Sequence, residues 1–181
     1  TTTEAVAREL MDHVELRVVT NNLHVAGLLS ANPSFEVIIA GGLVRSRDRG
    51  IVGEATLDLI RQFKVDFGII GISGVDAEGS LLDFDYREVR VSQAIIENAR
   101  RVVLVADATK LERTAPVRIA HLSQIQVFVT DRLPSPRLRT NRKPPMATPK
   151  LCMTRVWKRS RRAIRSRRRA HRATAGTRSS R

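Results

Sequence analysis

The sequence predicts an α/β fold in which helices cover both faces of a mostly parallel β-sheet. Short runs of apolar residues alternate along the chain with segments whose apolar residues recur at helical spacing. A strand that is apolar throughout is buried on both faces, as in parallel sheets whose strands are connected by helices. Each apolar run also ends at a glycine or a polar residue. In such sheets, ligands bind beyond the carboxyl ends of the strands, so these residues predict a binding site.

The predicted elements follow one another in regular order. We expect helices at 1–13, 22–32, 54–63 and 85–100, and strands at 16–20, 35–42, 65–71, 101–107 and 126–131. The first of these elements is a helix, whereas a doubly wound sheet normally opens with a strand. We therefore expect that the first strand is missing and that the domain is truncated at its N-terminus.

The charge divides the chain into two parts. Residues 1–131 contain all 18 acidic residues and 14 Lys and Arg, a net charge of −4. The remaining 18 Lys and Arg lie in 132–181, so the net charge of +14 comes from this C-terminal segment. We expect one domain over 1–138 and a disordered basic tail over 139–181, because the tail has too few apolar residues to form a core.

Several classes of site are not expected. Cys152 is the single cysteine, and the histidines are isolated in the sequence, so neither a disulfide framework nor a metal-ligand spacing is present. The sequence predicts no metal, no cofactor and no catalytic residue. It also contains no apolar run long enough for a membrane span and no signal peptide, which indicates a cytoplasmic protein.

Residues 1 to about 138 resemble the C-terminal effector-sensing domain of DeoR-family bacterial transcriptional repressors. The resemblance rests on the stretches VVTNNLHVA, VIIAGGLVRSRDRGIVGEATLDLIRQF, VDFGIIGISGVDAEGSLLDFDYREVRVSQAIIENAR and VVLVADATK. They are most similar to family members that respond to glycerol-3-phosphate. The resemblance implies a Rossmann-like sheet of the ribose-5-phosphate isomerase type and a phosphorylated small-molecule inducer. It also implies a homo-oligomer, and operator DNA bound by an N-terminal winged helix-turn-helix that this sequence lacks.

The same resemblance argues against an isomerase. Sugar-phosphate isomerases of the related fold place a carboxylate directly after the strand that corresponds to 65–71, and a lysine in the turn that follows. Here that position reads Gly71-Ile72-Ser73-Gly74, and 81–85 contain no lysine. Because groups that move a proton and stabilise an enediolate are needed for catalysis, we expect a pocket that binds without reacting. A sugar-phosphate isomerase is the alternative.

The ligand-binding residues are expected at the strand ends and in the loops that follow them. The predicted set is Thr1, Thr2, Thr3, Thr20, Asn21, Gly41, Gly42, Arg45, Gly71, Ser73, Gly74, Asp83, Asp85, Glu88 and Lys110. The three threonines at a helix start suit a phosphate, although they are also suited to N-capping alone. Lys110 suits an anionic ligand or an ion pair with Asp107 or Asp131.

Other members of the set have structural alternatives. One of Asn21 and Asn22 is expected to cap the next helix, and Asn21 is the one expected to contact the ligand. The Gly41-Gly42 pair suits a turn as well as a ligand wall. Arg45 suits a phosphate clamp or a solvated loop. Asp83, Asp85 and Glu88 suit ligand hydroxyls, while Asp85 also fits an N-capping pattern with Glu88.

The basic tail has two interpretations. Its positive charge would bind nucleic acid or any polyanion through counterion release. Alternatively, it is a frameshift product, because a GC-rich gene read out of frame yields Arg, Pro, Ser and Ala in this way. The resemblance ends abruptly near 136–139, which favours the second interpretation.

Overall fold

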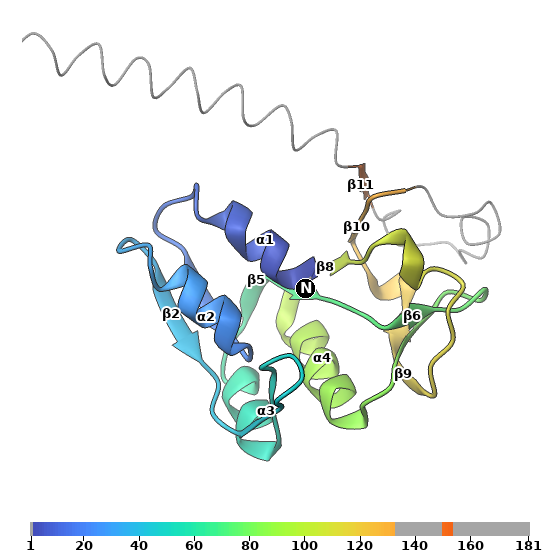
Figure 1. The fold of residues 1–181 in the computed structure, drawn as a ribbon, viewed down its shortest axis with the longest axis horizontal. Coiled ribbons are helices and arrows are strands. Elements are labelled where there is room, and N and C mark those ends of the chain that lie inside the picture. The colour runs from blue at the N-terminus through green and yellow to red at the C-terminus, as the bar shows by residue number, and fades with distance from the viewer. Residues whose placement is uncertain (1, 133–149, 154–181) are drawn as a thin grey trace, which may run out of the picture.

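The computed structural model describes residues 2–132 and 150–153, and it shows the predicted α/β architecture (Figure 1). The helices are α1 (Thr2–Leu10), α2 (Leu23–Leu29), α3 (Glu54–Arg61) and α4 (Tyr86–Asn98), with short 3₁₀ turns η1 (Ala108–Lys110) and η2 (Leu122–Gln124). The strands of the parallel pairs are β1 (Arg17–Thr20), β2 (Glu36–Ile39), β5 (Val65–Ile70), β8 (Ala99–Val105), β10 (Val127–Thr130) and β11 (Lys150–Met153). All four helices and the five expected strands are confirmed.

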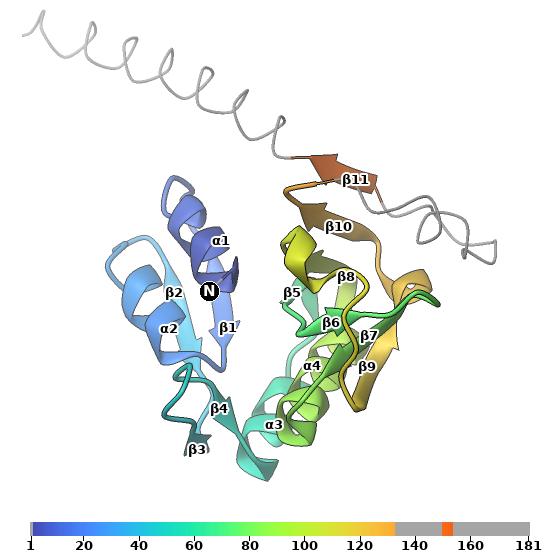
Figure 2. The same cartoon turned by 45° about the vertical axis from the view of Figure 1, so that its right-hand side comes forward.

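The parallel strands form two separate sheets. Strand β1 pairs with β2 alone, while β5, β8, β10 and β11 form a four-stranded sheet in the order β11-β10-β8-β5. Within the described residues, the second edges of β1 and β5 therefore have no strand partner. Figure 2 shows β1 and β2, with their helices, on one side and the four-stranded sheet on the other.

Short antiparallel strands, which the sequence analysis missed, lie in the connections that follow the parallel strands. Strands β3 (Leu43–Val44) and β4 (Ile51–Val52) form a hairpin after β2. Strands β6 (Gly74–Val75), β7 (Ser80–Asp83) and β9 (Val117–His121) form a second antiparallel sheet. Both groups lie between a parallel strand and the helix or strand that follows, so they shape the loops at the carboxyl ends.

The buried apolar side chains form separate clusters. The largest includes Leu104 and Phe128, and it joins β5, β8 and β10 to β6, β7, β9 and α4. A second cluster packs Val52 of β4 against α3 and α4. Ala7, Val25 and Leu29 form a separate small cluster between α1, α2 and the β1–β2 sheet. We call residues 2–39 the β1–β2 unit and residues 54–130 the β5–β10 unit, and the β3–β4 hairpin connects them.

Strand β11 lies in the basic segment that the sequence predicts to be disordered. It pairs in parallel with β10, with Val127 opposite Lys150 and Thr130 opposite Met153. The rest of that prediction concerns 139–149 and 154–181, which lie outside the described residues, as do 133–138 of the predicted domain. The same holds for Thr1 among the predicted ligand residues.

Candidate functional site

The polar residues at the end of β1 are bonded to the β3–β4 hairpin. The Asn21 side-chain Nδ2 donates to the Ile51 carbonyl at 3.0 Å, and the Ile51 N–H donates to the Asn21 carbonyl at 2.6 Å. Asn22 caps α2, because its Oδ1 accepts from the N–H groups of His24 and Val25. The expectation that one of the two asparagines is a helix cap is thus confirmed for Asn22.

The two glycines after β2 differ in their surroundings. Gly42 has φ = +146°, and a Cβ there would lie 2.4 Å from Thr56 Oγ1 and 2.7 Å from the Val52 carbonyl oxygen. A Cβ on Gly41 would meet nothing within 4 Å. Its carbonyl accepts a hydrogen bond of 2.7 Å from Thr56 Oγ1. Close packing therefore requires a glycine at 42, whereas position 41 is open.

The start of α1 lies beside the carboxyl end of β5. A Cβ on Gly71 would be 3.5 Å from Thr3 Oγ1, so the first turn of the helix and the end of the strand are neighbours. Thr2 and Thr3 lie in that first turn, where backbone N–H groups lack intrahelical partners and the helix dipole favours an anion. This places two predicted ligand regions together.

Ser73, Gly74 and Asp83 instead connect the strands of the second antiparallel sheet. Ser73 Oγ donates to Asp83 Oδ2 at 2.9 Å, while Asp83 Oδ1 accepts from the N–H of Phe84 at 2.6 Å. The Asp83 residue is only 7% exposed. Gly74 packs against the Arg113 backbone, whose carbonyl oxygen would lie 2.2 Å from a Cβ. These contacts fix the loop that leads into α4.

Arg45 lies at the centre of an ion cluster. Its guanidinium contacts Asp48 in the same hairpin, Asp85 Oδ2 at 2.9 Å and Glu88 Oε2 at 2.5 Å. The Arg45 side chain is 18% exposed, whereas those of Asp85 and Glu88 are 36% and 38% exposed, so the cluster is only partly shielded from water. Asp85 also caps α4, because its Oδ1 accepts from the Arg87 N–H at 2.9 Å. The capping alternative for Asp85 is confirmed, and Arg45 is bound by carboxylates.

The cluster shifts the pKa of its members in different directions. For Arg45, burial opposes the charged form, but hydrogen bonding to Asp85 and the charge of Glu88 outweigh it and raise the pKa. Burial likewise opposes the charge on Asp85, yet hydrogen bonds from Arg45 and the Arg87 N–H lower its pKa. For Glu88, burial and the charge of Asp83 raise the pKa despite Arg45. Burial therefore opposes the charged form of Glu88, whereas Arg45 favours that of Asp85.

Lys110 lies half-buried at the end of η1, after the carboxyl end of β8. Its backbone N–H donates to the Asp107 carbonyl at 3.1 Å, and its ammonium group forms no ion pair within 4.0 Å among the described residues. Asp107 caps η1 through the Thr109 N–H, while Asp131 Oδ1 accepts from the Ala108 N–H at 2.7 Å. Hydrogen bonding from Thr109 lowers the Asp107 pKa, and the charge of Lys110 adds to this effect. The two acids therefore hold the loop and leave the ammonium group available.

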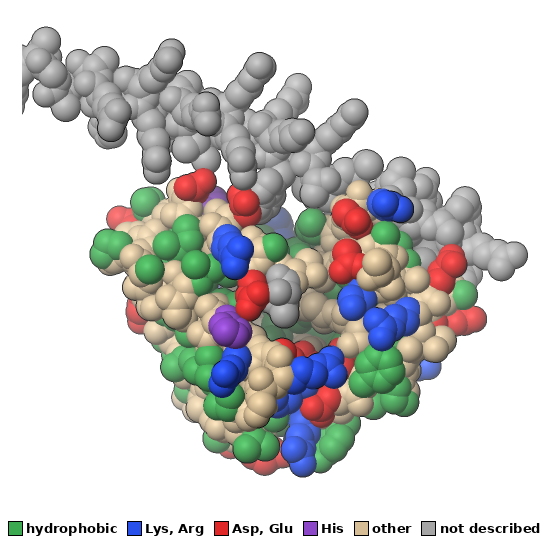
Figure 3. Space-filling view, in the orientation of Figure 1, with side chains coloured by type: hydrophobic (Ala, Val, Ile, Leu, Met, Phe, Trp, Pro, Cys, Tyr) green, Lys and Arg blue, Asp and Glu red, His purple; other side chains and the backbone are tan. Residues whose placement is uncertain are grey.

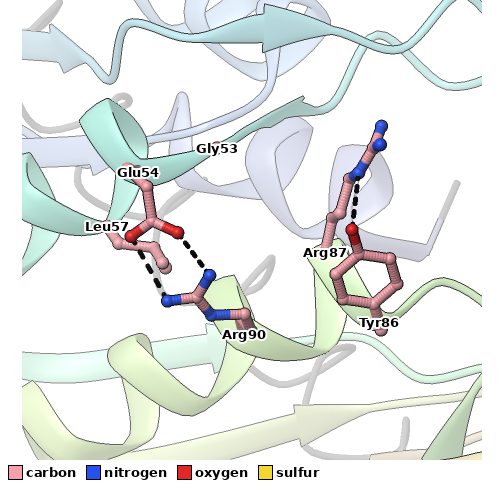
Figure 4. A pocket seen from close by; sticks show the side chains of 6 residues that line it. All are labelled: Gly53, Glu54, Leu57, Tyr86, Arg87 and Arg90. Atoms are coloured by element: carbon pink, nitrogen blue, oxygen red, sulfur yellow. Dashed lines mark hydrogen bonds and ion pairs between the residues drawn. The ribbon is translucent and has the colours of Figure 1, made fainter.

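The face of the molecule in Figure 3 is hollowed at its centre, and charged side chains of both signs surround the hollow. A separate pocket between the starts of α3 and α4 is lined by Gly53, Glu54, Leu57, Tyr86, Arg87 and Arg90 (Figure 4). There, Glu54 forms a two-point ion pair with Arg90. None of these six residues belongs to the predicted set. Within the described part of the chain, no group of His, Cys, Asp and Glu is placed to hold a metal ion, and no helix is long and apolar enough to cross a membrane.

Comparison with known proteins identifies relatives of this domain. A family model described as the DeoR C-terminal sensor domain matches residues 1–132. The glycerol-3-phosphate regulon repressor of Escherichia coli K12 is 56% identical over 134 residues, which cover 74% of this chain and 53% of that protein. The repressor of the same name from Haemophilus influenzae is 54% identical, and the match covers 74% of this chain and 52% of that protein. The E. coli repressor CsqR is 38% identical, over 77% and 54%. The chain thus spans about half the length of these relatives.

Proposed function

Since this chain belongs to the family of DeoR C-terminal sensor domains, we propose that it binds a phosphorylated small molecule at the carboxyl ends of β1, β5 and β8. Glycerol-3-phosphate is the first candidate, because proteins more than 50% identical to this chain are named as repressors of the glycerol-3-phosphate regulon. Binding would control the attachment of a DNA-binding domain to operator DNA. Such control works by a population shift, in which the effector favours one arrangement of the protein over another.

The Lys110 side chain is the observation that carries this proposal. A half-buried lysine without an ion pair among the described residues, in the loop after β8, suits an anion. The first turn of α1 supplies backbone N–H groups beside Gly71, at the neighbouring strand end. We call the region between the carboxyl ends of β1, β5 and β8 the effector crevice, and we assign the phosphate to its Lys110 end. The hydroxyls are assigned to the end formed by Asn21, Asp83 and Glu88. The carboxylates there would repel the phosphate, but they can accept hydrogen bonds from hydroxyls.

We propose sensing rather than catalysis because protein donors already hold the carboxylates near the crevice, which leaves them able to accept further hydrogen bonds from ligand hydroxyls but not free to move to a substrate proton. Asp83 accepts three hydrogen bonds from Ser73, Phe84 and Asp85. Asp85 and Glu88 are paired with Arg45. A general base needs a carboxylate that can reach the substrate proton. The arrangement therefore supports positioning of a ligand, not proton transfer on it.

Calorimetric titration of the full chain with sn-glycerol 3-phosphate tests the proposal. We expect saturable binding that Lys110→Ala weakens by about 10- to 100-fold, the range for loss of one charge-assisted hydrogen bond. Lys64→Ala is the matched control, because Lys64 is an exposed lysine whose Nζ contacts only the Glu97 carbonyl in the described residues. The absence of binding to the parent chain, or an equal loss in both variants, would contradict the proposal.

A further inference from the structure

The position of Asn21 is set by the β3–β4 hairpin. Beyond the two Asn21–Ile51 hydrogen bonds, the Leu23 N–H donates to the Arg49 carbonyl at 3.1 Å, and Asn22 Nδ2 donates to the Asp48 carbonyl at 3.0 Å. The end of β1 is thus bonded to the return side of the hairpin. Any movement of the hairpin relative to the rest of the molecule carries Asn21 with it.

Arg45 connects this hairpin to the other side of the crevice. It lies in the turn of the hairpin, and it contacts Asp85 and Glu88 at the start of α4, 40 and 43 positions further along the chain. A guanidinium offers several donors in a fixed plane, so it can hold carboxylates from two elements in one geometry. A lysine has a single charged nitrogen and cannot reproduce that arrangement.

The cluster contains more negative than positive charge. Glu88 faces Arg45 and Asp48 from the hairpin and Asp83 from β7. Asp85, at the start of the same helix, shares Arg45 with Glu88 and also interacts with Arg87. Arg45 is the cation in direct contact with the Glu88 carboxylate. Removal of one partner of a partly shielded ion pair leaves the remaining charges unbalanced, so loss of Arg45 should loosen the turn of the hairpin from the start of α4, while Val52 still packs against Val91 and Ala94.

We propose that Arg45 is the positioning residue of the effector crevice. It ties the turn of the hairpin that holds Asn21 to the first turn of α4. Together with the packing of Val52 against α4, it sets the spacing between the Asn21 side and the Glu88 side. The inference rests on the proposed function for the identity of the ligand. The contacts of Arg45 with Asp85 and Glu88 form without a ligand. Arg45 contacts the acids beside the ligand and acts through them.

Amide hydrogen exchange of the full chain without ligand tests the tie. In Arg45→Gln and Arg45→Lys, the N–H groups of Ile51 and Leu23 should exchange at least tenfold faster, while the Leu104 N–H in the central strand keeps its parent rate. Glu88→Gln keeps Arg45 and the side-chain shape, and it should raise the same exchange rates by a smaller factor. Unchanged rates at Ile51 and Leu23 in all three variants would overturn the proposal.

Titration with sn-glycerol 3-phosphate tests the effect on recognition. Arg45→Gln should weaken binding about tenfold, whereas Arg17→Gln, which removes the exposed Arg17–Glu36 pair at 2.6 Å, should leave it unchanged. A parent chain that binds and an Arg45→Gln variant that binds equally well would contradict this inference alone. A parent chain that does not bind would contradict the proposed function. The exchange experiment, which needs no ligand, would still test whether Arg45 links the hairpin to α4.

The pH dependence of binding separates positioning from a merely structural role. A charged Glu88 disfavours an anionic ligand, so affinity should rise as the pH falls through the Glu88 pKa. Without the Arg45 charge this step should move to higher pH, and it should vanish in the Arg45→Gln, Glu88→Gln double variant. The Glu88→Gln variant is the reference for the parent chain. The ligand phosphate titrates in the same way with both proteins, so the difference between their pH profiles comes from Glu88. A step at the same pH with and without Arg45 would contradict the assignment.

Discussion

The β1–β2 unit and the β5–β10 unit differ in how they are held together. The largest core of the β5–β10 unit contains eleven buried residues, drawn from six strands, helix α4 and two loop positions. The small core of the β1–β2 unit contains three, Ala7, Val25 and Leu29. Local stability follows the amount of buried apolar contact, so we expect the β1–β2 unit to open more readily. The candidate crevice takes groups from both units. One side of it therefore belongs to the unit expected to open more readily, and the other side to the more stable unit.

The largest expected effect comes from removing a core leucine. Leu104 is 0% exposed, and Leu104→Ala should lower the free energy of unfolding by about 3–5 kcal/mol, measured by denaturant titration. Leu29 is 1% exposed in the small core. Leu29→Ala should speed amide exchange in residues 17–39 and leave exchange in β8 near the parent rate. An equal acceleration in β8 would show that the two units do not open separately.

The glycine pair at the junction of the units gives the next largest effect. Gly42→Ala should cost about 2–3 kcal/mol of unfolding free energy, because its φ is positive and its Cβ would overlap Thr56 and Val52. Gly41→Ala is the matched control, and it should change the unfolding free energy by less than about 0.5 kcal/mol. Similar losses in both variants would show that the hairpin does not pack as described.

A smaller effect concerns the pH dependence of stability at the start of α4. The Glu88 pKa is raised above its ordinary value of 4.5, chiefly by burial, so the folded state holds the proton more tightly than the unfolded state. Stability from this group should therefore fall as the pH rises from 4.5 through the raised pKa. Melting temperatures between pH 4.5 and 7.5 should decline less in Glu88→Gln than in the parent. A steeper decline would reverse the assigned sign.

The smallest effect is expected within the β1–β2 unit itself. Arg17 and Glu36 pair across β1 and β2, but their side chains are 70% and 57% exposed. Exposed pairs contribute roughly 0.2–1 kcal/mol, so Arg17→Gln should lie at the low end of the series in denaturant titration. A loss comparable to that of Leu104→Ala would mean that charge, rather than apolar burial, stabilises this unit.

Much of the fold follows from local patterns. The helices and the parallel strands are predicted because their apolar periodicity extends over several residues, as in Val102 to Val105. Strands β3, β4 and β6 were missed because they have two residues each and lie among glycines and charged residues. Leu43–Val44 and Ile51–Val52, for example, flank a turn with three arginines. Two-residue strands carry too little pattern to be distinguished from a loop. Strands β7 and β9 have four and five residues, but polar or charged residues interrupt or flank their apolar ones.

The sequence predicted where the site lies, at the strand ends, but not which side chains contact one another across the fold. The caps made by Asn22 and Asp85 follow from sequence because the groups they bind lie within three residues. The contact of Arg45 with Asp85 depends on how a hairpin folds against a helix 40 positions away. Asp48, which completes the Arg45 cluster, was also missed, although its position three residues after Arg45 in a turn was a usable signal.

Amide hydrogen exchange of the full chain, with and without saturating sn-glycerol 3-phosphate, tests the central claim most directly. If the crevice joins the two units, the ligand should slow exchange at Leu23 and Ile51 on one side and at Lys110 on the other. No change at these three amides, or protection confined to the pocket between α3 and α4, would contradict the account.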